Sequence, residues 1–267
     1  MLVTSDVLVA QELNWSEEET QVLSWLNDTH DHFSSVAHQI WEWAELGYLE
    51  ERSSTLLQDQ LSEAGFIIEH DVAGMPTAFV ATYGSGEPVI GMLAEFDALP
   101  GVSQAALPYR QEREDQTAGH ACGHHLFGTG STAAAIAVRR WMEAYAVEGT
   151  LKVFGTPAEE GGSGKVYMVR EGLFDDVDVV LHWHPSSQNS ASAASCLAIK
   201  SAKFRFYGTS SHAAGSPWRG RSALDGVEAM NDMVNLMREH VPPESRIHYV
   251  ITEGGEAPNV IPAFAEV

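Results

Sequence analysis

Basic residues are scarce in this sequence. Its 267 residues include 15 Lys and Arg against 37 Asp and Glu, which gives a formal net charge of −22 at pH 7. So negative a chain repels phosphate backbones and anionic membranes. We therefore expect neither nucleic acid nor a membrane as a partner, whereas metal cations and small substrates remain compatible with the charge.

Cysteines and long apolar runs are also few. Cys122 and Cys196 are the two cysteines, too few for a disulfide framework. The first ten residues lack the basic start of a signal peptide and carry Asp6 among their aliphatic residues. The longest apolar stretches, at 133–138 and 177–181, are far shorter than a membrane span. These absences predict a soluble, cytoplasmic protein.

The hydrophobic pattern changes its period along the chain. Apolar residues at three- and four-residue steps predict one long helix over 17–46 and a second helix over 53–64. Short β-type runs then alternate with helical segments. The expected strands are 66–70, 77–83, 89–95, 151–155 and 177–184, and the expected helices are 126–145 and 165–171. This alternation predicts an α/β fold, with a mixed, mostly parallel sheet flanked by helices.

The composition shifts at residues 186–195, where Ser, Ala and Asn dominate and indicate a linker. Beyond it, the pattern predicts a small α+β domain. Its expected strands are 197–207, 246–252 and 261–267, and its expected helix is 222–240. We therefore expect one domain over 1–196 and a second over 197–267.

The tripeptide Cys122-Gly123-His124 is the most informative short motif. Zinc-like ions favour thiolate and imidazole ligands, and a glycine between the two residues lets both side chains turn to one point. Alone, the motif is a weak signal, and a buried cysteine beside a helix-capping histidine is the competing interpretation. Two further histidines, His120 and His125, favour a polar, functional loop.

Two adjacent carboxylates, Glu159 and Glu160, follow the expected strand 151–155 almost directly. The carboxyl ends of strands are where α/β folds bind ligands. Neighbouring residues point in different directions, so one carboxylate can bind a metal while the other takes a proton from water. A solvated acidic turn is the competing interpretation in so acidic a chain.

Two other expected strands also end in possible ligands. His182 and His184 share one face at the end of the strand 177–184, and the sequence leaves open which of them binds a metal. Glu95 and Asp97 close the strand 89–95, and Asp97 could orient a ligand histidine. The convergence of all these strand ends predicts one metal-carboxylate site at the carboxyl edge of the sheet.

Two other site types fail on spacing. The run from Gly161 to Lys165 resembles a phosphate-binding loop, but Glu159 stands where its first glycine is needed and Val166 where Ser or Thr is needed. No Gly-x-Ser-x-Gly sequence marks a serine nucleophile elbow.

Four ordered motifs together resemble the M20 metallopeptidase/amidohydrolase family, in the branch of the B-type subunits of aminobenzoyl-glutamate hydrolase. They are AEFDALP at 94–100, GHACGH at 119–124, GTPAEEGG at 155–162 and SHAA at 211–214. The resemblance runs from about residue 17 to the end of the chain. It implies a zinc-peptidase-like catalytic domain, a lid domain through which two copies form a homodimer, and two divalent metal ions, Zn or Mn. The implied substrate is a small N-acyl amino acid or a dipeptide-like amide.

The resemblance also implies roles for individual residues. The implied metal ligands are Cys122, which bridges the two ions, His124, Glu160 and His184, with His182 as the alternative to His184. Glu159 is implied as the general base and acid, and Asp97 as the residue that orients His124. His212 is implied to cross a dimer interface and stabilise the tetrahedral intermediate, and Asn259 to contact the substrate carboxylate.

The sequence departs from the family pattern at two places. His125 follows the Cys-Gly-His motif where the family commonly has Asp, and the chain ends at Val267, within the expected lid. In the family the catalytic domain resumes after the lid and supplies a last ligand histidine. The resemblance therefore implies a truncated chain. The alternative function is a non-catalytic subunit that acts in assembly or metal binding.

Overall fold

The computed structural model of the protein describes residues 14–191 and 195–267. The described residues up to Ser190 form one compact unit and those from Ala191 form another, and the two are called the first and second unit below. Residues 1–10, where we expect no signal peptide, and residues 192–194 of the expected linker lie outside the described ranges. No helix among the described residues is long and apolar enough to cross a membrane.

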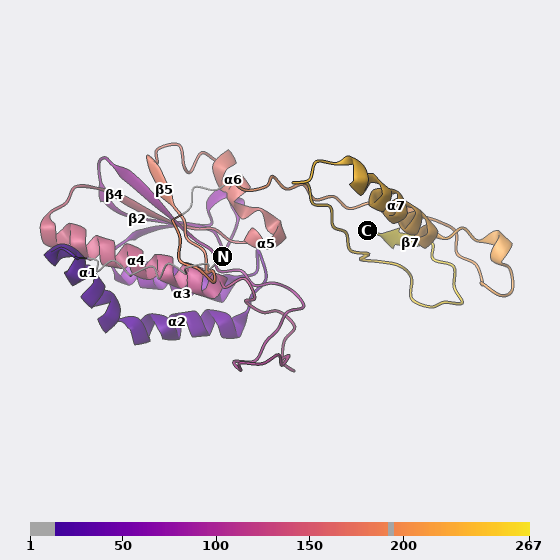
Figure 1. The fold of residues 1–267 in the computed structure, drawn as a ribbon, viewed down its shortest axis with the longest axis horizontal. Coiled ribbons are helices and arrows are strands. Elements are labelled where there is room, and N and C mark those ends of the chain that lie inside the picture. Colours follow the sequence, from indigo (N-terminus) through magenta and orange to yellow (C-terminus); the bar gives the residue numbers. More distant parts are fainter. Residues whose placement is uncertain (1–13, 192–194) are drawn as a thin grey trace, which may run out of the picture. The chain divides into compact units, whose positions relative to one another are not determined.

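A five-stranded sheet forms the centre of the first unit (Figure 1). Its strands are β1 (Ile67–His70), β2 (Phe79–Ser85), β3 (Val89–Ala94), β4 (Gly149–Gly155) and β5 (Val179–Leu181), in the order β1-β2-β4-β3-β5. β3 pairs in parallel with both β4 and β5, whereas β2 is antiparallel to both of its neighbours. Every strand except β2 therefore runs in the same direction, and the predicted α/β fold is confirmed.

Helices cover the sheet on both faces. The helices of the first unit are α1 (Glu17–Asp28), α2 (His30–Trp43), α3 (Glu51–Glu63), α4 (His124–Tyr145), α5 (Glu159–Gly162) and α6 (Gly164–Arg170), with a short 3₁₀ turn η1 (Val72–Gly74). In Figure 1, α1 to α4 lie together below the sheet. The alternation of side chains along β4 explains the two layers, because Val153 packs with α2, α3 and α4 while Phe154 packs with Met168 of α6.

The predicted single helix over 17–46 is wrong, because the chain breaks at Thr29. This residue has φ −102° and ψ 5°, and its hydroxyl donates a hydrogen bond back to Trp25 O at 2.8 Å. Side-chain bonds of this kind compete with the regular helix, and Asn, Asp and Thr favour them. α1 therefore ends at Asp28, and α2 starts afresh at His30.

The second unit contains α7 (Ala223–Met237), the strands β6 (Arg205–Tyr207) and β7 (Phe264–Glu266), and the 3₁₀ turns η2 (Pro217–Arg219) and η3 (Arg238–His240). Phe206 of β6 lies opposite Ala265 of β7 in an antiparallel pair. The core consists of four buried residues, Ala223, Val227, Ala265 and Val267.

Two strand predictions for the second unit are wrong. The strand predicted over 197–207 is limited to its last three residues, and the segment 246–252 forms no strand. Residues 197–204 are exposed to solvent, and β6 begins only where Phe206 packs against the small core. A strand needs a partner and an apolar face to be stable, and β-type composition alone supplies neither.

Candidate metal centre

Three strands of the first unit end at the same edge of the sheet. The parallel register places Ala94 of β3 beside Gly155 of β4, and Met92 of β3 beside Leu181 of β5. The residues that follow these three ends are those singled out in the sequence, namely Glu95 and Asp97, Glu159 and Glu160, and His182 and His184. Because the strands are parallel, their polar ends meet at one place.

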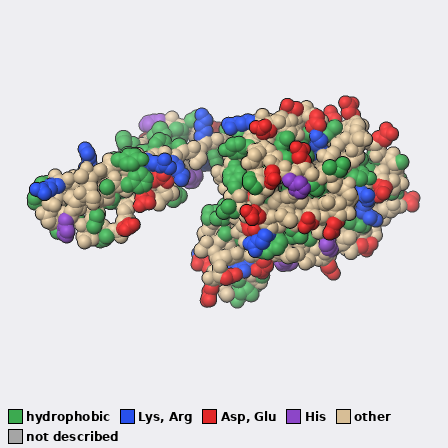
Figure 2. All heavy atoms as spheres, turned by 180° about the vertical axis from the view of Figure 1, so that it is seen from behind, with side chains coloured by type: hydrophobic (Ala, Val, Ile, Leu, Met, Phe, Trp, Pro, Cys, Tyr) green, Lys and Arg blue, Asp and Glu red, His purple; other side chains and the backbone are tan. Residues whose placement is uncertain are grey.

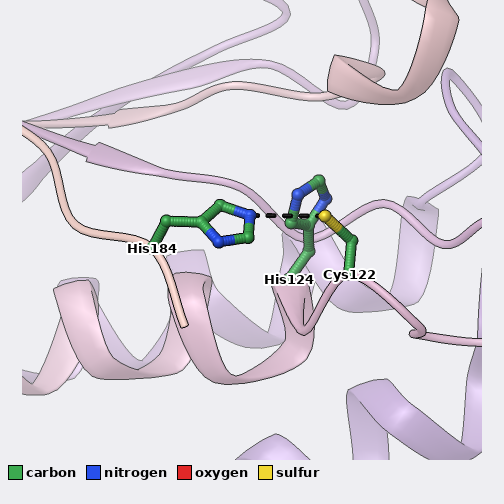
Figure 3. A group of neighbouring side chains, drawn as sticks. All are labelled: Cys122, His124 and His184. Atoms are coloured by element: carbon green, nitrogen blue, oxygen red, sulfur yellow. Dashed lines mark hydrogen bonds between the residues drawn. The ribbon is translucent and has the colours of Figure 1, made fainter. Parts of the chain in front are cut away.

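Cys122, His124 and His184 form the first possible ligand group (Figure 3). One ligand atom from each of the three lies within 4.8 Å of the others, and Cys122 Sγ is 3.3 Å from His184 Nε2. His184 Nδ1 donates to Pro185 O at 2.9 Å, which leaves Nε2 as the nitrogen that faces the sulfur. The three side chains come from the α4 start and the β5 end, and they point toward one another.

Gly123 makes this convergence possible. It lies in the left-handed region at φ +85°, directly before the first residue of α4. A Cβ atom at this position would lie 3.0 Å from Pro185 Cγ, so a side chain would be both strained and crowded. The tight turn lets Cys122 and His124 face the same point and brings Pro185, next to His184, against them.

His124 is fully buried and oriented by Asp97. Its Nδ1 donates to Asp97 Oδ1 at 2.9 Å and lies 3.1 Å from Asp97 O. Burial lowers the pKa of His124, but the hydrogen bond and charge of Asp97, together with Glu95, more than offset this, so the pKa lies above its ordinary value. A carboxylate on one ring nitrogen is the usual device that directs the other nitrogen toward a metal.

A second possible ligand group consists of Glu95, His124 and Glu159. His124 Nε2 lies 3.1 Å from Glu95 Oε2 and 3.9 Å from Glu159 Oε2. Glu95 is 3% exposed and also forms an ion pair with Lys165 of α6. Burial, and then the charge of Glu95, raise the pKa of Glu159 above its ordinary value.

Glu160 connects the acidic turn to both groups. Its backbone N–H donates to Asp97 Oδ2 at 2.8 Å, so Asp97 orients His124 and holds the turn as well. Burial of the thiol, and then the neighbouring Glu160 carboxylate, raise the pKa of Cys122 to about 12. The thiol, the carboxylates and the buried imidazole thus crowd together at this edge.

These residues fit a divalent metal ion. His124 Nε2 and Glu160 Oε1 are both buried and form no hydrogen bond; for Nε2 this holds despite its 3.1 Å distance to Glu95 Oε2. A buried polar atom without a partner costs free energy unless something else binds it. A thiol, imidazoles and carboxylates are the ligand types of zinc sites, and carboxylates also suit manganese.

The sequence left the choice between His184 and His182 open, and the structure places them differently. His184 faces Cys122, as described above, whereas His182 Nε2 lies 3.9 Å from Glu95 Oε1. The His182 ring packs edge-on against Phe127 at a centroid distance of 5.0 Å. Burial lowers the pKa of His182, which favours its neutral form.

Glu95 was singled out in the sequence as a strand-end residue without a role of its own, and Lys165 was not predicted as a site residue. Glu95 ends the same expected strand as Asp97, so its position was a usable signal. Lys165 follows the glycine-rich run that fails as a phosphate-binding loop, and nothing else in the sequence pointed to it. Its ion pair with Glu95 joins the start of α6 to the residue after β3, which spacing alone does not predict.

His212 and Asn259 lie in the second unit, beside each other. An antiparallel bridge joins His212 to Val260, and Ala213 N donates to Asn259 O at 3.0 Å. His212 Nδ1 accepts hydrogen bonds from the backbone N–H groups of Ala214 at 3.2 Å and Gly215 at 3.1 Å. In a neutral ring the proton is therefore on Nε2, and the exposed side chain offers a donor to solvent.

Comparison with known proteins yields one family and several relatives. The model of peptidase family M20/M25/M40 matches residues 91–261. The B-type subunit of p-aminobenzoyl-glutamate hydrolase from Escherichia coli (strain K12) is 46% identical over 88% of this chain and 49% of its own length. Mus musculus Xaa-Arg dipeptidase is 32% identical over 91% of this chain and 55% of its own length. The chain thus spans about half the length of the curated relatives it matches.

A solved structure supports the fold. A dinuclear metal-binding peptidase of the M20 family from Bacillus subtilis superposes with a TM-score of 0.58 at 19% sequence identity. The superposition covers 90% of this chain and 63% of the other.

Proposed function

The chain belongs to peptidase family M20/M25/M40, and on that premise we propose that it acts in the metal-dependent hydrolysis of small amides. The substrate class is N-acyl amino acids or dipeptide-like amides, with aminobenzoyl-glutamate as the first example. One observation carries this proposal, the convergence of Cys122, His124 and His184 with Glu95 and Glu159 at one sheet edge. The named functions of the relatives, an aminobenzoyl-glutamate hydrolase and a dipeptidase, support the substrate class.

The proposed metal ligands are Cys122, His124, Glu160 and His184, with His182 as the alternative to His184. The buried, unpartnered atoms of His124 and Glu160 support their assignment. Two divalent ions, zinc or manganese, would lower the pKa of a bound water and polarise the substrate carbonyl. The identity of the metal follows from loading experiments with each ion separately.

Glu159 is the proposed general base. It follows the end of β4, is not itself in the proposed ligand set, and is partly exposed to solvent. We assign it to remove the proton from the attacking water and to deliver that proton to the leaving amine. Its raised pKa suits this task, because a base whose pKa lies nearer neutrality can both accept and return a proton. Asp97 orients His124 throughout.

The proposed substrate contacts come from the second unit. His212 would donate its Nε2 proton to the oxyanion, and the two hydrogen bonds at its Nδ1 support that tautomer. Asn259 would donate its side-chain amide to the substrate carboxylate. Its backbone bond to Ala213 keeps it beside His212, which supports a shared role.

We also propose that the chain associates through its second unit, as a homodimer. The exposed apolar side chains of α7, Met233, Leu236 and Met237, support an association surface there. The similar Escherichia coli protein is named as one subunit of its enzyme, so a complex with a different chain is the competing arrangement. Light scattering after size-exclusion chromatography of the purified chain separates a dimer from a monomer that awaits another partner.

The direct test is hydrolysis by the purified full chain after loading with zinc or manganese. A panel of aminobenzoyl-glutamate, a hippurate-like acyl amino acid and a dipeptide should yield at least one cleaved amide. Cleavage that disappears with a chelator and returns with the metal supports the proposal. Stoichiometric metal with no cleavage of any amide would instead favour a non-catalytic role in metal binding or assembly.

A further inference from the structure

The turn that carries Glu159 and Glu160 has an unusual backbone. Ala158 immediately before it and Ser163 immediately after it both lie in the left-handed region, at φ +54° and φ +58°. A residue other than glycine is sterically strained in this region, because its Cβ approaches the following carbonyl oxygen. Such a conformation persists only where the surroundings hold it in place. The contacts around Ala158 therefore decide where the two carboxylates point.

The buried carboxylate of Glu50 binds the backbone of Ala158. Glu50 is 0% exposed, and its Oε1 accepts a hydrogen bond from the Ala158 backbone N–H at 2.8 Å. Its Oε2 accepts from the Thr77 hydroxyl at 2.9 Å. Burial of so polar a group is costly, and burial raises the pKa of Glu50. The metal-site chemistry described above makes no use of this residue.

The residues just before Glu50 close around the same turn. The Tyr48 hydroxyl donates to Gly162 O at 2.6 Å. Gly47 lies so close that a Cβ atom on it would be 2.9 Å from both Cα and Cβ of Ala158. We call residues 47–50 the clasp. The clasp thus contacts Ala158, directly before the turn, and Gly162, the last residue of the turn.

The two residues directly before the clasp bind the strand end that carries Asp97. Ala98 N donates to Glu45 O at 2.8 Å, and Leu46 forms a parallel bridge with Ala98. Asp97 in turn accepts from the backbone N–H of Glu160. One short segment therefore sets the distance between the residue that orients His124 and the turn that carries the general base.

We propose that Glu50 is a positioning residue, whose carboxylate fixes the backbone of Ala158 and so directs the side chains of Glu159 and Glu160. Its effect on turnover rests on the proposed function, whereas its effect on the turn does not. Small displacements of a catalytic group can cost about 10²-fold in rate. Loss of the Glu50 hydrogen bonds should therefore lower kcat with little effect on KM.

The test compares three variants of the full chain by hydrogen–deuterium exchange of the Ala158 amide and by kinetics. Glu50→Ala removes both hydrogen bonds and should speed the exchange of this amide by about 10-fold or more, with a comparable loss in kcat. Glu50→Gln keeps an oxygen for the Ala158 N–H and an amide that can donate to the Thr77 hydroxyl. This conservative variant should restore slow exchange and most of kcat. Thr77→Val removes one bond and should give an intermediate exchange rate.

Three results would overturn the proposal. Glu50→Ala could lower the melting temperature while the Ala158 exchange rate and kcat stay at wild-type values, which would make the residue a fold element only. Glu50→Gln could move the acid limb of the pH–rate profile, which would show that charge and not position matters. If Glu50→Ala does not fold, Thr77→Val takes its place: an Ala158 exchange rate equal to that of the wild type in Thr77→Val would overturn the proposal. If the wild-type chain cleaves no amide, the proposed function fails but the exchange rates still decide the role of Glu50.

Discussion

The two units differ sharply in charge and in core. Residues 1–190 contain 29 Asp and Glu against 8 Lys and Arg, whereas residues 191–267 contain 8 against 7. Almost all of the net negative charge therefore belongs to the first unit, and Figure 2 shows acidic side chains spread over its visible face. The first unit has a five-stranded sheet with apolar cores on both faces, whereas the second has a two-stranded sheet over four buried residues.

This contrast separates two kinds of chemistry. Both possible ligand groups found among the described residues lie in the first unit, where rigid strand ends hold donors for a cation. The second unit carries His212 and Asn259, whose side chains each have an N–H that can donate, and neither residue belongs to such a group. We thus assign metal binding and proton transfer to the first unit and contacts with the substrate to the second. Variants in each unit test the two sides of that division.

The largest effect is expected from Cys122→Ala. Loss of the thiolate should remove stoichiometric metal and, with it, all metal-dependent activity, because the metal needs its deprotonated ligands. Metal analysis of the purified variant measures this directly. Cys196→Ala is the matched control, because Cys196 is an exposed thiol in the second unit. Equal metal content in both variants would contradict the assignment of metal binding to Cys122 and the first unit.

Glu159→Gln should leave the metal content intact and lower kcat by about 10²–10⁴-fold, because the base is lost and the ligands are not. Glu160→Gln is the comparison variant and should lower metal affinity as well. Steady-state kinetics with metal analysis on the same samples measures both quantities. Wild-type turnover in Glu159→Gln would show that another group accepts the proton.

His212→Ala tests the second unit. Loss of a donor to the oxyanion should lower kcat by about 10²–10³-fold with metal content unchanged. His240→Ala serves as the control, since His240 is another exposed histidine of the same unit. If His212→Ala instead lost metal, the second unit would take part in binding the ion, and the division would be wrong.

The smallest effect concerns acid stability of the first unit. Burial lowers the pKa of His120 to about 4, whereas in the unfolded chain it is near its ordinary value of about 6.5. Below pH 6.5 the unfolded chain binds a proton that the folded chain does not, so stability is full above pH 6.5 and declines as the pH falls toward 4. Between pH 7 and pH 5 the loss is on the order of 2 kcal/mol.

Urea unfolding at pH 7 and pH 5, with chelator present, measures this decline. Trp218 belongs to the second unit and the other described tryptophans to the first, so fluorescence in a Trp218→Phe background reports the first unit. His120→Gln keeps a donor for Ile40 O and removes the titration. A decline of the same size in this variant would exclude His120 as its cause.

Much of the first unit could be predicted from the sequence. Its strands were recognisable by their apolar runs, and the polar residues at their ends could be placed at one edge because parallel strands share direction. The contacts of Lys165 with Glu95, and of Glu50 with Ala158, could not be predicted. The first contact joins residues that are 70 positions apart in the sequence, and the second joins residues that are 108 positions apart. No local sequence pattern encodes such a pairing.

The second unit was harder to predict for a physical reason. Its segments 197–204 and 246–252 have β-type composition, yet only short strands form beside the small core around Val227. The break at Thr29 was missed because the apolar period continues across it. In both places the hydrophobic pattern is misleading. The missing strand partner decides the structure of the second unit, and side-chain hydrogen bonding decides it at Thr29.

The central claim is that the thiol of Cys122 and the imidazole of His124 bind one cluster of divalent ions at the sheet edge. X-ray absorption at the zinc edge of the zinc-loaded full chain tests it most directly. We predict sulfur scattering at ~2.3 Å together with nitrogen and oxygen at ~2.0–2.2 Å, and loss of the sulfur shell in Cys122→Ala. A spectrum with nitrogen and oxygen alone, identical in the wild type and in Cys122→Ala, would contradict it.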